Sequence, residues 1–358
     1  MAQTTRIQQK YSVETQSAKL KEALSNEDLG SHPLSEDKTP TGDEKQVLHV
    51  TLASPRGFCA GVERAVRTVE DTLKTFGPPV YIRHEIVHNT HVIKRLEAMG
   101  AIFTDDIDRV PQDRPLILSA HGSPEAIFSH ARTAKLNLID ATCPLVTKVH
   151  TQARKLAAMG YHILLIGHAG HQEVIGTMGQ AEASQISLVE TVEDARTLSV
   201  PDCPLAYISQ TTLSVDETND IIEALTLRFP DIVGPAKTDI CYATTNRQAA
   251  IKAIAPDSDM VVVIGSATSS NSKRMVEVAL NCGARAAVLT DGASSFDWQS
   301  LKGLKKLGLS SGASVPDDLI EDFLAKLASH FSIVVDTIEI ARESISFKMP
   351  SIAAKGTT

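Results

Sequence analysis

Three cysteines recur at domain-sized intervals in this chain of 358 residues. Cys59, Cys143 and Cys241 each follow a predicted β-strand and precede a helical pattern, with gaps of 84 and 98 residues between them. These gaps are far longer than the C-x₂-C spacing of zinc ribbons or thioredoxin-type motifs. Cysteines so far apart can meet only if the chain folds as three units around one centre. Three thiolates at one point suggest an iron–sulfur cluster with one iron free for substrate, because such clusters usually take four cysteines.

Two further points concern the roles of the other two cysteines and the identity of the metal. Cys203 and Cys282 lie outside the repeated position, and we expect them to be small buried apolar residues. A zinc ion held by three thiolates and a water also remains open, although zinc sites normally take ligand pairs from nearby turns.

The elements that must position these cysteines repeat with them. From residue 46 onward, short β-branched runs alternate with helical patterns, which is typical of βαβ units and parallel sheet. The predicted strands form three sets of four, and the first strand of each set leads into a cysteine. The sets are 47–53, 80–83, 101–103 and 116–119; then 136–141, 162–167, 186–190 and 205–209; then the segment before Cys241, 260–265, 286–290 and 307–311.

Polar loops follow the second and fourth strands of each set. Ligands bind beyond the carboxyl ends of strands in open parallel sheets, so loops from all three units should meet in one cavity. Small neutral or titratable donors at helix N-termini can bind phosphate there without a lysine cluster. Helix capping alone would explain any one loop but not the histidines. The candidate anion-binding residues are His88, His121, His171, Thr211, Ser269, Ser270, Asn271 and Ser314.

Glu173 lies two residues after His171 in the same loop. A carboxylic acid near an iron-bound oxygen could deliver protons if burial raises its pKa. Glu173 could equally be an ordinary first-turn glutamate that complements the helix dipole. Spacing alone does not decide between these two roles.

We expect an α/β fold of three pseudo-equivalent small domains, each with a mostly parallel four-stranded sheet, arranged around a central cluster cavity. Residues 1–46 are polar and lack apolar periodicity, which predicts a disordered N-terminal extension. Residues 47–60 form the first strand and cysteine loop, a segment that can pack with the third domain. The three α/β domains are expected at 61–143, 144–240 and 241–330, followed by a C-terminal tail at 331–358.

Composition narrows the class of protein. The chain has no run of about 18 apolar residues and no apolar N-terminal region, which predicts neither a membrane span nor a secretory signal. Five cysteines without dense spacing fit the reducing cytoplasm. A net charge of −8 argues against a general nucleic-acid binder, so local donors must hold any anionic ligand.

Several motifs together resemble one known family. PRGFCAGV, HEIVHN, SAHG, DATCPLVTKVH, QTTLSVD, DICYATTNRQ and SSNS stand in the order and spacing of the 4-hydroxy-3-methylbut-2-enyl diphosphate reductase family, over about residues 47–350. The resemblance implies one oxygen-sensitive [4Fe–4S] cluster per chain on the three cysteines. It also implies that the eight donors above bind the diphosphate and that Glu173 delivers protons, with Thr211 as its hydroxyl partner. Ala267 and Thr268 depart from the family, since many relatives carry Lys-Asn there.

The implied reaction is a reductive dehydroxylation that yields isopentenyl and dimethylallyl diphosphate, the last step of the methylerythritol phosphate route to isoprenoids. The implied electron donor is reduced ferredoxin or flavodoxin. Two other functions remain open from the residues: a cluster-dependent hydro-lyase, which needs no electrons, and a non-catalytic iron–sulfur sensor. Whether turnover requires a reductant distinguishes the reductase from these two functions.

Overall fold

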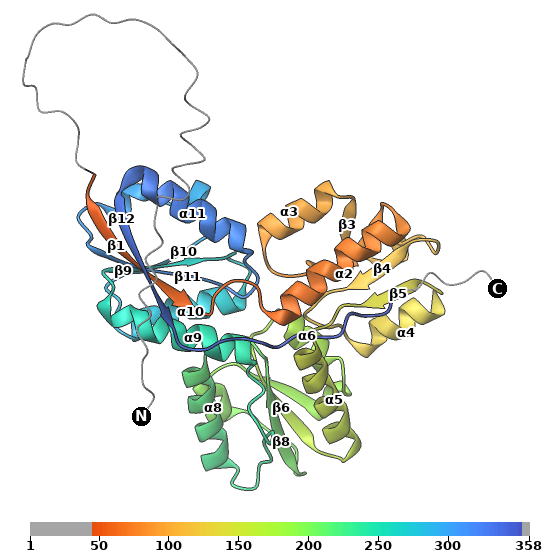
Figure 1. Ribbon diagram of the computed structural model, residues 1–358. Coiled ribbons are helices and arrows are strands. Elements are labelled where there is room, and N and C mark those ends of the chain that lie inside the picture. The colour runs from red at the N-terminus through yellow and green to blue at the C-terminus, as the bar shows by residue number, and fades with distance from the viewer. Residues whose placement is uncertain (1–44, 353–358) are drawn as a thin grey trace, which may run out of the picture.

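Three lobes, each with its own parallel sheet, make up the protein (Figure 1). The computed structural model describes residues 45–352. Residues 1–44, which hold nearly all of the predicted N-terminal extension, and residues 353–358 lie outside this range. The predicted three-part α/β fold is confirmed, but the sheets have five, four and three strands instead of four each.

The first lobe carries a four-stranded sheet in the order β3-β2-β4-β5, with every pair parallel. Ile82 and Ile117 of this sheet are fully buried against Val66 and Val69 of the first helix. The sequence analysis placed the strand at 136–141 in the second set of strands. This placement was wrong, because the segment pairs with β4 in the first lobe. The elements are α2 (Ala60–Phe76), β2 (Val80–Arg83), α3 (Thr90–Ala98), β3 (Ala101–Thr104), β4 (Pro115–Leu118), α4 (Glu125–Thr133) and β5 (Asn137–Asp140).

The second lobe has a three-stranded sheet in the order β7-β6-β8. Its central strand β6 is buried along its whole length, and apolar clusters pack around it. The fourth strand expected here is β5 of the first lobe. The elements are α5 (Pro144–Ala158), β6 (His162–Ile166), α6 (Gln172–Met178), β7 (Ile186–Val189), α7 (Val192–Thr197), β8 (Leu205–Ser209) and α8 (Val215–Arg228).

The third lobe contains the largest sheet, in the order β10-β9-β11-β1-β12. The first strand of the chain lies between two late strands, since Thr51 is in register with Gly308 on one side and Asp336 on the other. Leu48, Val50 and Leu52 of this strand join the core around Phe323, which explains its place. The elements are β1 (Val47–Ser54), α9 (Tyr242–Ile254), β9 (Met260–Ile264), α10 (Ser270–Asn281), β10 (Ala287–Thr290), β11 (Lys306–Ser311), α11 (Asp317–His330) and β12 (Ser332–Glu339).

The structure adds two observations to the sequence analysis of this lobe. The segment before Cys241 bends repeatedly and forms no strand beyond one isolated bridge between Val233 and Ala206. The predicted tail 331–358 contains β12, which completes the sheet beside β1. Our domain division at 61–143, 144–240 and 241–330 remains a proposal. Within residues 45–352, no helix is both long and apolar enough to pass through a bilayer.

Candidate functional site

A cavity of about 100 Å³ is lined by loops from all three lobes. Its wall includes every residue that the sequence analysis proposed as a ligand, donor or acid. These are Cys59, His88, His121, Cys143, His171, Glu173, Thr211, Cys241, Ser269, Ser270, Asn271 and Ser314. The other two cysteines do not line it.

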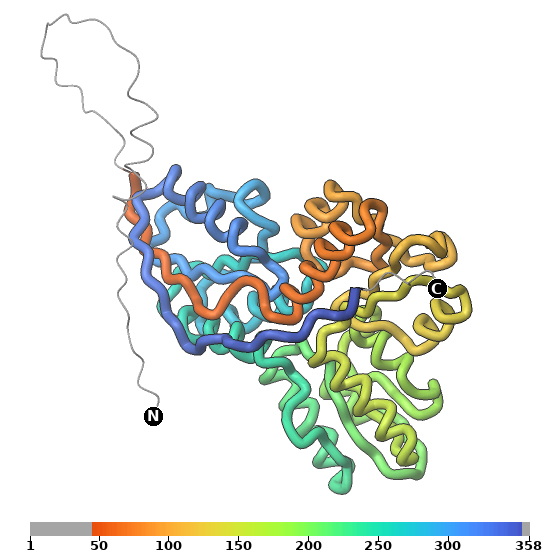
Figure 2. The backbone as a smooth tube through the Cα atoms, turned by 45° about the vertical axis from the view of Figure 1, so that its right-hand side comes forward, coloured from red at the N-terminus to blue at the C-terminus, as the bar shows by residue number. Residues whose placement is uncertain are grey.

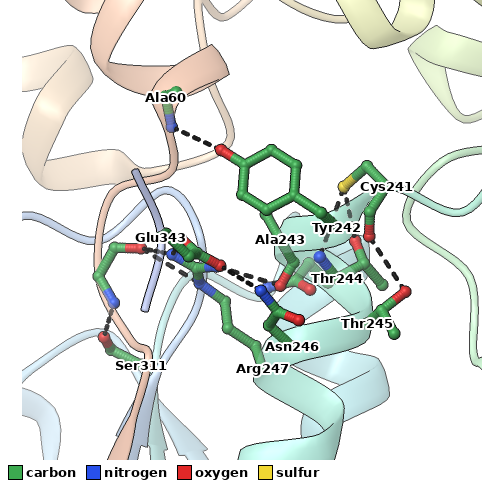
Figure 3. Close-up of polar contacts among 12 residues, drawn as sticks. Ala60, Cys241, Tyr242, Ala243, Thr244, Thr245, Asn246, Arg247, Ser311 and Glu343 are labelled. Carbon is green, nitrogen blue, oxygen red and sulfur yellow. Dashed lines mark hydrogen bonds and ion pairs between the residues drawn. The ribbon is translucent and has the colours of Figure 1, made fainter. Parts of the chain in front are cut away.

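Each of the three cysteines is the N-cap residue of a helix. Cys59 precedes α2, Cys143 precedes α5 and Cys241 precedes α9. The Cys241 sulfur accepts from the Thr244 N–H at 3.4 Å and lies 3.2 Å from the Thr244 hydroxyl (Figure 3). All three sulfur atoms therefore belong to residues at the positive dipole end of a helix, a position that favours thiolates.

Burial of the free thiols has the opposite effect, because it disfavours the charged thiolate. Burial, with smaller contributions from the other two cysteine sulfurs, raises the pKa of Cys143 to about 12. Burial first, and then Cys59, raises the pKa of Cys241 to about 11. These thiols are therefore protonated at neutral pH until a cation binds and replaces the protons.

Gly61 keeps the space between two of the sulfur atoms open. A Cβ atom at this position would lie 2.7 Å from the Cys143 sulfur and 3.8 Å from the Cys59 sulfur. Both sulfurs thus lie close to one point, and any side chain there would fill the gap between them. Among residues 45–352, no three His, Cys, Asp or Glu side chains are grouped as ligands of a metal ion.

Three histidines from two lobes gather on one wall of the cavity. The His88 and His121 rings stack with 4.0 Å between centroids, and the His171 ring meets them edge-on at 5.4 and 6.0 Å. Burial, followed by the neighbouring histidines, lowers the pKa of His121 well below its ordinary value. Burial and then His88 lower the pKa of His171 to about 3. His121 and His171 are therefore neutral at neutral pH.

Unpartnered polar atoms mark this wall as a place for a polar ligand. His88 Nε2 and His121 Nδ1 are buried and have no hydrogen-bond partner in the described part of the chain. Buried polar atoms are rarely left without a partner, so such atoms in a cavity wall indicate a ligand. His171 caps α6 through Nδ1, which accepts from the Glu173 N–H at 3.2 Å.

The third lobe supplies the facing donors at the start of α10. Ser269 caps this helix by accepting from the Ser272 N–H at 3.3 Å, so the capping role is real for this residue. Asn271 is buried, and its Oδ1 has no partner within residues 45–352. Ser314 donates to the His88 carbonyl at 2.9 Å and links the third lobe to the histidine wall. Capping therefore accounts for only part of this set.

Glu173 and Thr211 form a buried pair in the same cavity. The Thr211 N–H donates to Glu173 Oε1 at 2.6 Å, and the Thr211 hydroxyl donates to Oε2 at 3.1 Å. Burial, assisted by the Asp239 carboxylate, raises the pKa of Glu173 to about 7 despite these two hydrogen bonds. Only 2% of Glu173 is exposed, whereas a glutamate that serves the helix dipole alone is normally solvated.

Sequence reasoning missed two residues around the site, Gln210 and Tyr242. Gln210 donates to Thr212 Oγ1 at 2.8 Å and to Ser270 Oγ at 3.4 Å, which joins the second and third lobes. The Tyr242 hydroxyl accepts from the Ala60 N–H at 3.3 Å, beside Cys59 (Figure 3). Both residues stand inside motifs that the sequence analysis quoted, next to a proposed residue, which was the available signal.

Comparisons with known proteins agree with this geometry. The LytB protein family model matches residues 50–328. A 4-hydroxy-3-methylbut-2-enyl diphosphate reductase of Hyphomonas neptunium is 52% identical over 311 residues, covering 87% of this chain and 99% of the relative. The enzyme of the same name from Gluconobacter oxydans is 50% identical over 318 residues, covering 87% and 95%. The solved structure of the E-1-hydroxy-2-methyl-but-2-enyl-4-diphosphate reductase from Plasmodium falciparum aligns with a TM-score of 0.80 and 40% identity, covering 86% of this chain and 96% of that chain.

Proposed function

This chain belongs to the LytB family, and we propose from that premise which residues carry out its reaction. It is an oxidoreductase that reduces 4-hydroxy-3-methylbut-2-enyl diphosphate to isopentenyl and dimethylallyl diphosphate, the last step of the methylerythritol phosphate pathway. The observation that carries the residue-level proposal is the single cavity that contains three thiols, unpartnered histidine and amide atoms, and a buried acid.

We propose that Cys59, Cys143 and Cys241 hold one [4Fe–4S] cluster. The open space at Gly61 and the three helix N-termini support this assignment. A cluster binds its cysteines through separate irons, so its ligands need not converge as those of a single ion do. When bound there, the cluster would supply electrons one at a time and a Lewis-acidic iron.

The two donor walls hold the diphosphate in our proposal. His88 Nε2 and His121 Nδ1 are buried atoms without a partner in the described chain and can meet its oxygens. Asn271 Nδ2, which makes only a weak contact with the Met275 sulfur at 3.5 Å, can donate to the same ligand. The histidines are well suited because an entering anion raises the pKa of a neighbouring imidazole. They can take up protons as the ligand binds and so supply positive charge only when it is needed.

Glu173 supplies the proton that makes the hydroxyl a good leaving group. With a pKa of about 7, its carboxyl is protonated in a large part of the molecules at neutral pH. When it is protonated, its O–H can donate to Thr211 Oγ1, and the Thr211 hydroxyl can then donate into the cavity. Two electrons and two protons exchange the C–O bond for a C–H bond and release the oxygen as water.

Anaerobic turnover with and without a low-potential reductant tests this function. Product that forms only with reductant supports the reductase, whereas product formed equally without reductant would favour the hydro-lyase. Absence of any conversion in cluster-loaded protein would favour the sensor. We further propose a cytoplasmic location and reduced ferredoxin or flavodoxin as the donor, supported by the five free cysteines and by the reaction's need for single electrons.

A further inference from the structure

The end of the described chain crosses from one lobe to another. After β12, residues 340–352 form no helix or strand and run from the third lobe to the first (Figures 1 and 2). We name residues 340–352 the C-terminal strap. It begins where the Ile340 N–H donates to the Ser54 carbonyl at 3.0 Å, and it ends where Ile352 packs on the first-lobe core. The strap lies beyond the part of the chain that the family model matches.

One anchor of the strap is a buried ion pair. The Arg247 side chain is 0% exposed and the Glu343 side chain 14% exposed, with 3.0 Å between Arg247 Nη1 and Glu343 Oε1. Arg247 Nη2 also donates to the Gly57 carbonyl at 2.7 Å. Gly57 stands two residues before Cys59, and Arg247 lies on α9, which Cys241 caps. One guanidinium therefore connects two cysteine loops and the strap.

A second arginine connects the strap to the third cysteine loop. Arg64 lies on α2, which Cys59 caps, and its Nε donates to the Lys348 carbonyl at 2.8 Å. Its Nη1 donates to the Thr142 carbonyl at 3.1 Å. Thr142 immediately precedes Cys143. The side chains of Arg247 and Arg64 thus connect the strap to all three cysteine loops.

We propose that the C-terminal strap, through Arg247 and Arg64, positions the three cysteines for the cluster. This inference rests on the function proposed above. The loops of Cys59 and Cys143 follow strands of separate sheets, and the Cys241 loop follows a segment that is not a strand, so contacts outside the sheets must set their spacing. A buried charge pair with good geometry is a poor source of stability but can specify one arrangement. Outer contacts of this kind commonly change metal affinity by about 10- to 100-fold.

The test uses point variants in the full chain. Glu343→Gln keeps the shape of the first anchor but removes its charge, and Arg64→Ala removes the second anchor. Arg342→Ala is the matched control, because Arg342 lies on the strap beside Glu343, is 81% exposed and pairs only with Glu339 among the described residues. Two quantities are measured anaerobically: the rate of iron release from the holoenzyme to a chelator, and the alkylation rate of each cysteine in the apoprotein.

We expect both anchor variants to release iron roughly 10-fold faster or more, while Arg342→Ala behaves as the wild type. In the apoprotein, Glu343→Gln should speed alkylation of Cys59 and Cys241, and Arg64→Ala that of Cys59 and Cys143. Cys203 and Cys282, which do not line the cavity, serve as internal controls. Equal acceleration at all five cysteines, or rates equal to the control, would overturn the proposal. If the wild type itself held no cluster, the proposed function would fail, and the alkylation pattern would still decide on the strap.

Discussion

The two walls that face the diphosphate site differ in one physical respect. The histidine wall (His88, His121 and His171) comes from the first and second lobes, and the hydroxyl–amide wall (Ser269, Ser270 and Asn271) comes from the third. The hydroxyl–amide wall is buried at the start of α10, whereas the histidine side chains are partly buried in the loops that precede helices, and only the histidine wall can change its charge. An acidic chain can therefore bind an anion with one wall that gains protons and one that supplies fixed, uncharged donors.

The largest effect should come from removing a cysteine ligand of the proposed cluster. Cys143→Ser should lose nearly all cluster iron and activity, because two remaining thiolates cannot hold a cluster that already has one open iron. Iron and sulfide analysis with a turnover assay measures both. Cys203→Ser and Cys282→Ser, outside the cavity, should keep cluster and activity. A Cys143→Ser protein that still converted substrate would contradict the proposal that three cysteines hold the cluster.

Glu173→Gln should lower kcat by about 10²-fold or more, the usual loss for a missing general acid, with nearly normal substrate binding. The pKa of about 7 gives the direction with pH. The acid is protonated below this pKa, so the wild-type kcat should fall as pH rises through about 7. A kcat–pH profile of the variant should lack this fall. Normal turnover in the Gln variant would make Glu173 a structural residue.

His121→Phe tests the histidine wall. The lowered pKa of His121 means that it is neutral before binding, and an anion should raise that pKa. Binding should therefore take up protons, and affinity should fall as pH rises. Calorimetry in buffers of different ionisation enthalpy measures this uptake. The variant should lose at least about 1–3 kcal/mol of binding and part of the proton uptake. Undiminished uptake would exclude His121 as a charged contact.

The hydroxyl–amide wall should show the smaller and pH-independent response. Ser269→Ala and Asn271→Ala should each weaken binding by about 1–3 kcal/mol, because each leaves a buried ligand oxygen without a partner. Their proton uptake should equal that of the wild type, which makes them matched controls for His121→Phe. Wild-type affinity in both variants would leave Ser269 as a helix cap and place the ligand elsewhere.

Local signals predicted the site better than they predicted the sheets. The cysteines, histidines and Glu173 stand at strand ends next to helix starts, a feature that short motifs record. The partners of β1 depend instead on contacts with strands at the other end of the chain, and β5 pairs with the preceding strand β4 rather than with the strands that follow it. The β-branched run of β12, from Ile333 to Ile338, was a visible strand signal that we assigned to a tail. Arg247 gave no local signal, because its importance comes from Gly57 and Glu343, roughly 100 to 190 residues away.

The central claim is that three cysteines from three lobes hold a cluster with one iron left for substrate. Mössbauer spectra of anaerobically purified protein, recorded with and without 4-hydroxy-3-methylbut-2-enyl diphosphate, test it most directly. We expect about four irons per chain, one of which differs from the other three and changes when substrate binds. Iron-free protein that contains zinc, or a spectrum in which no iron responds to substrate, would contradict the account.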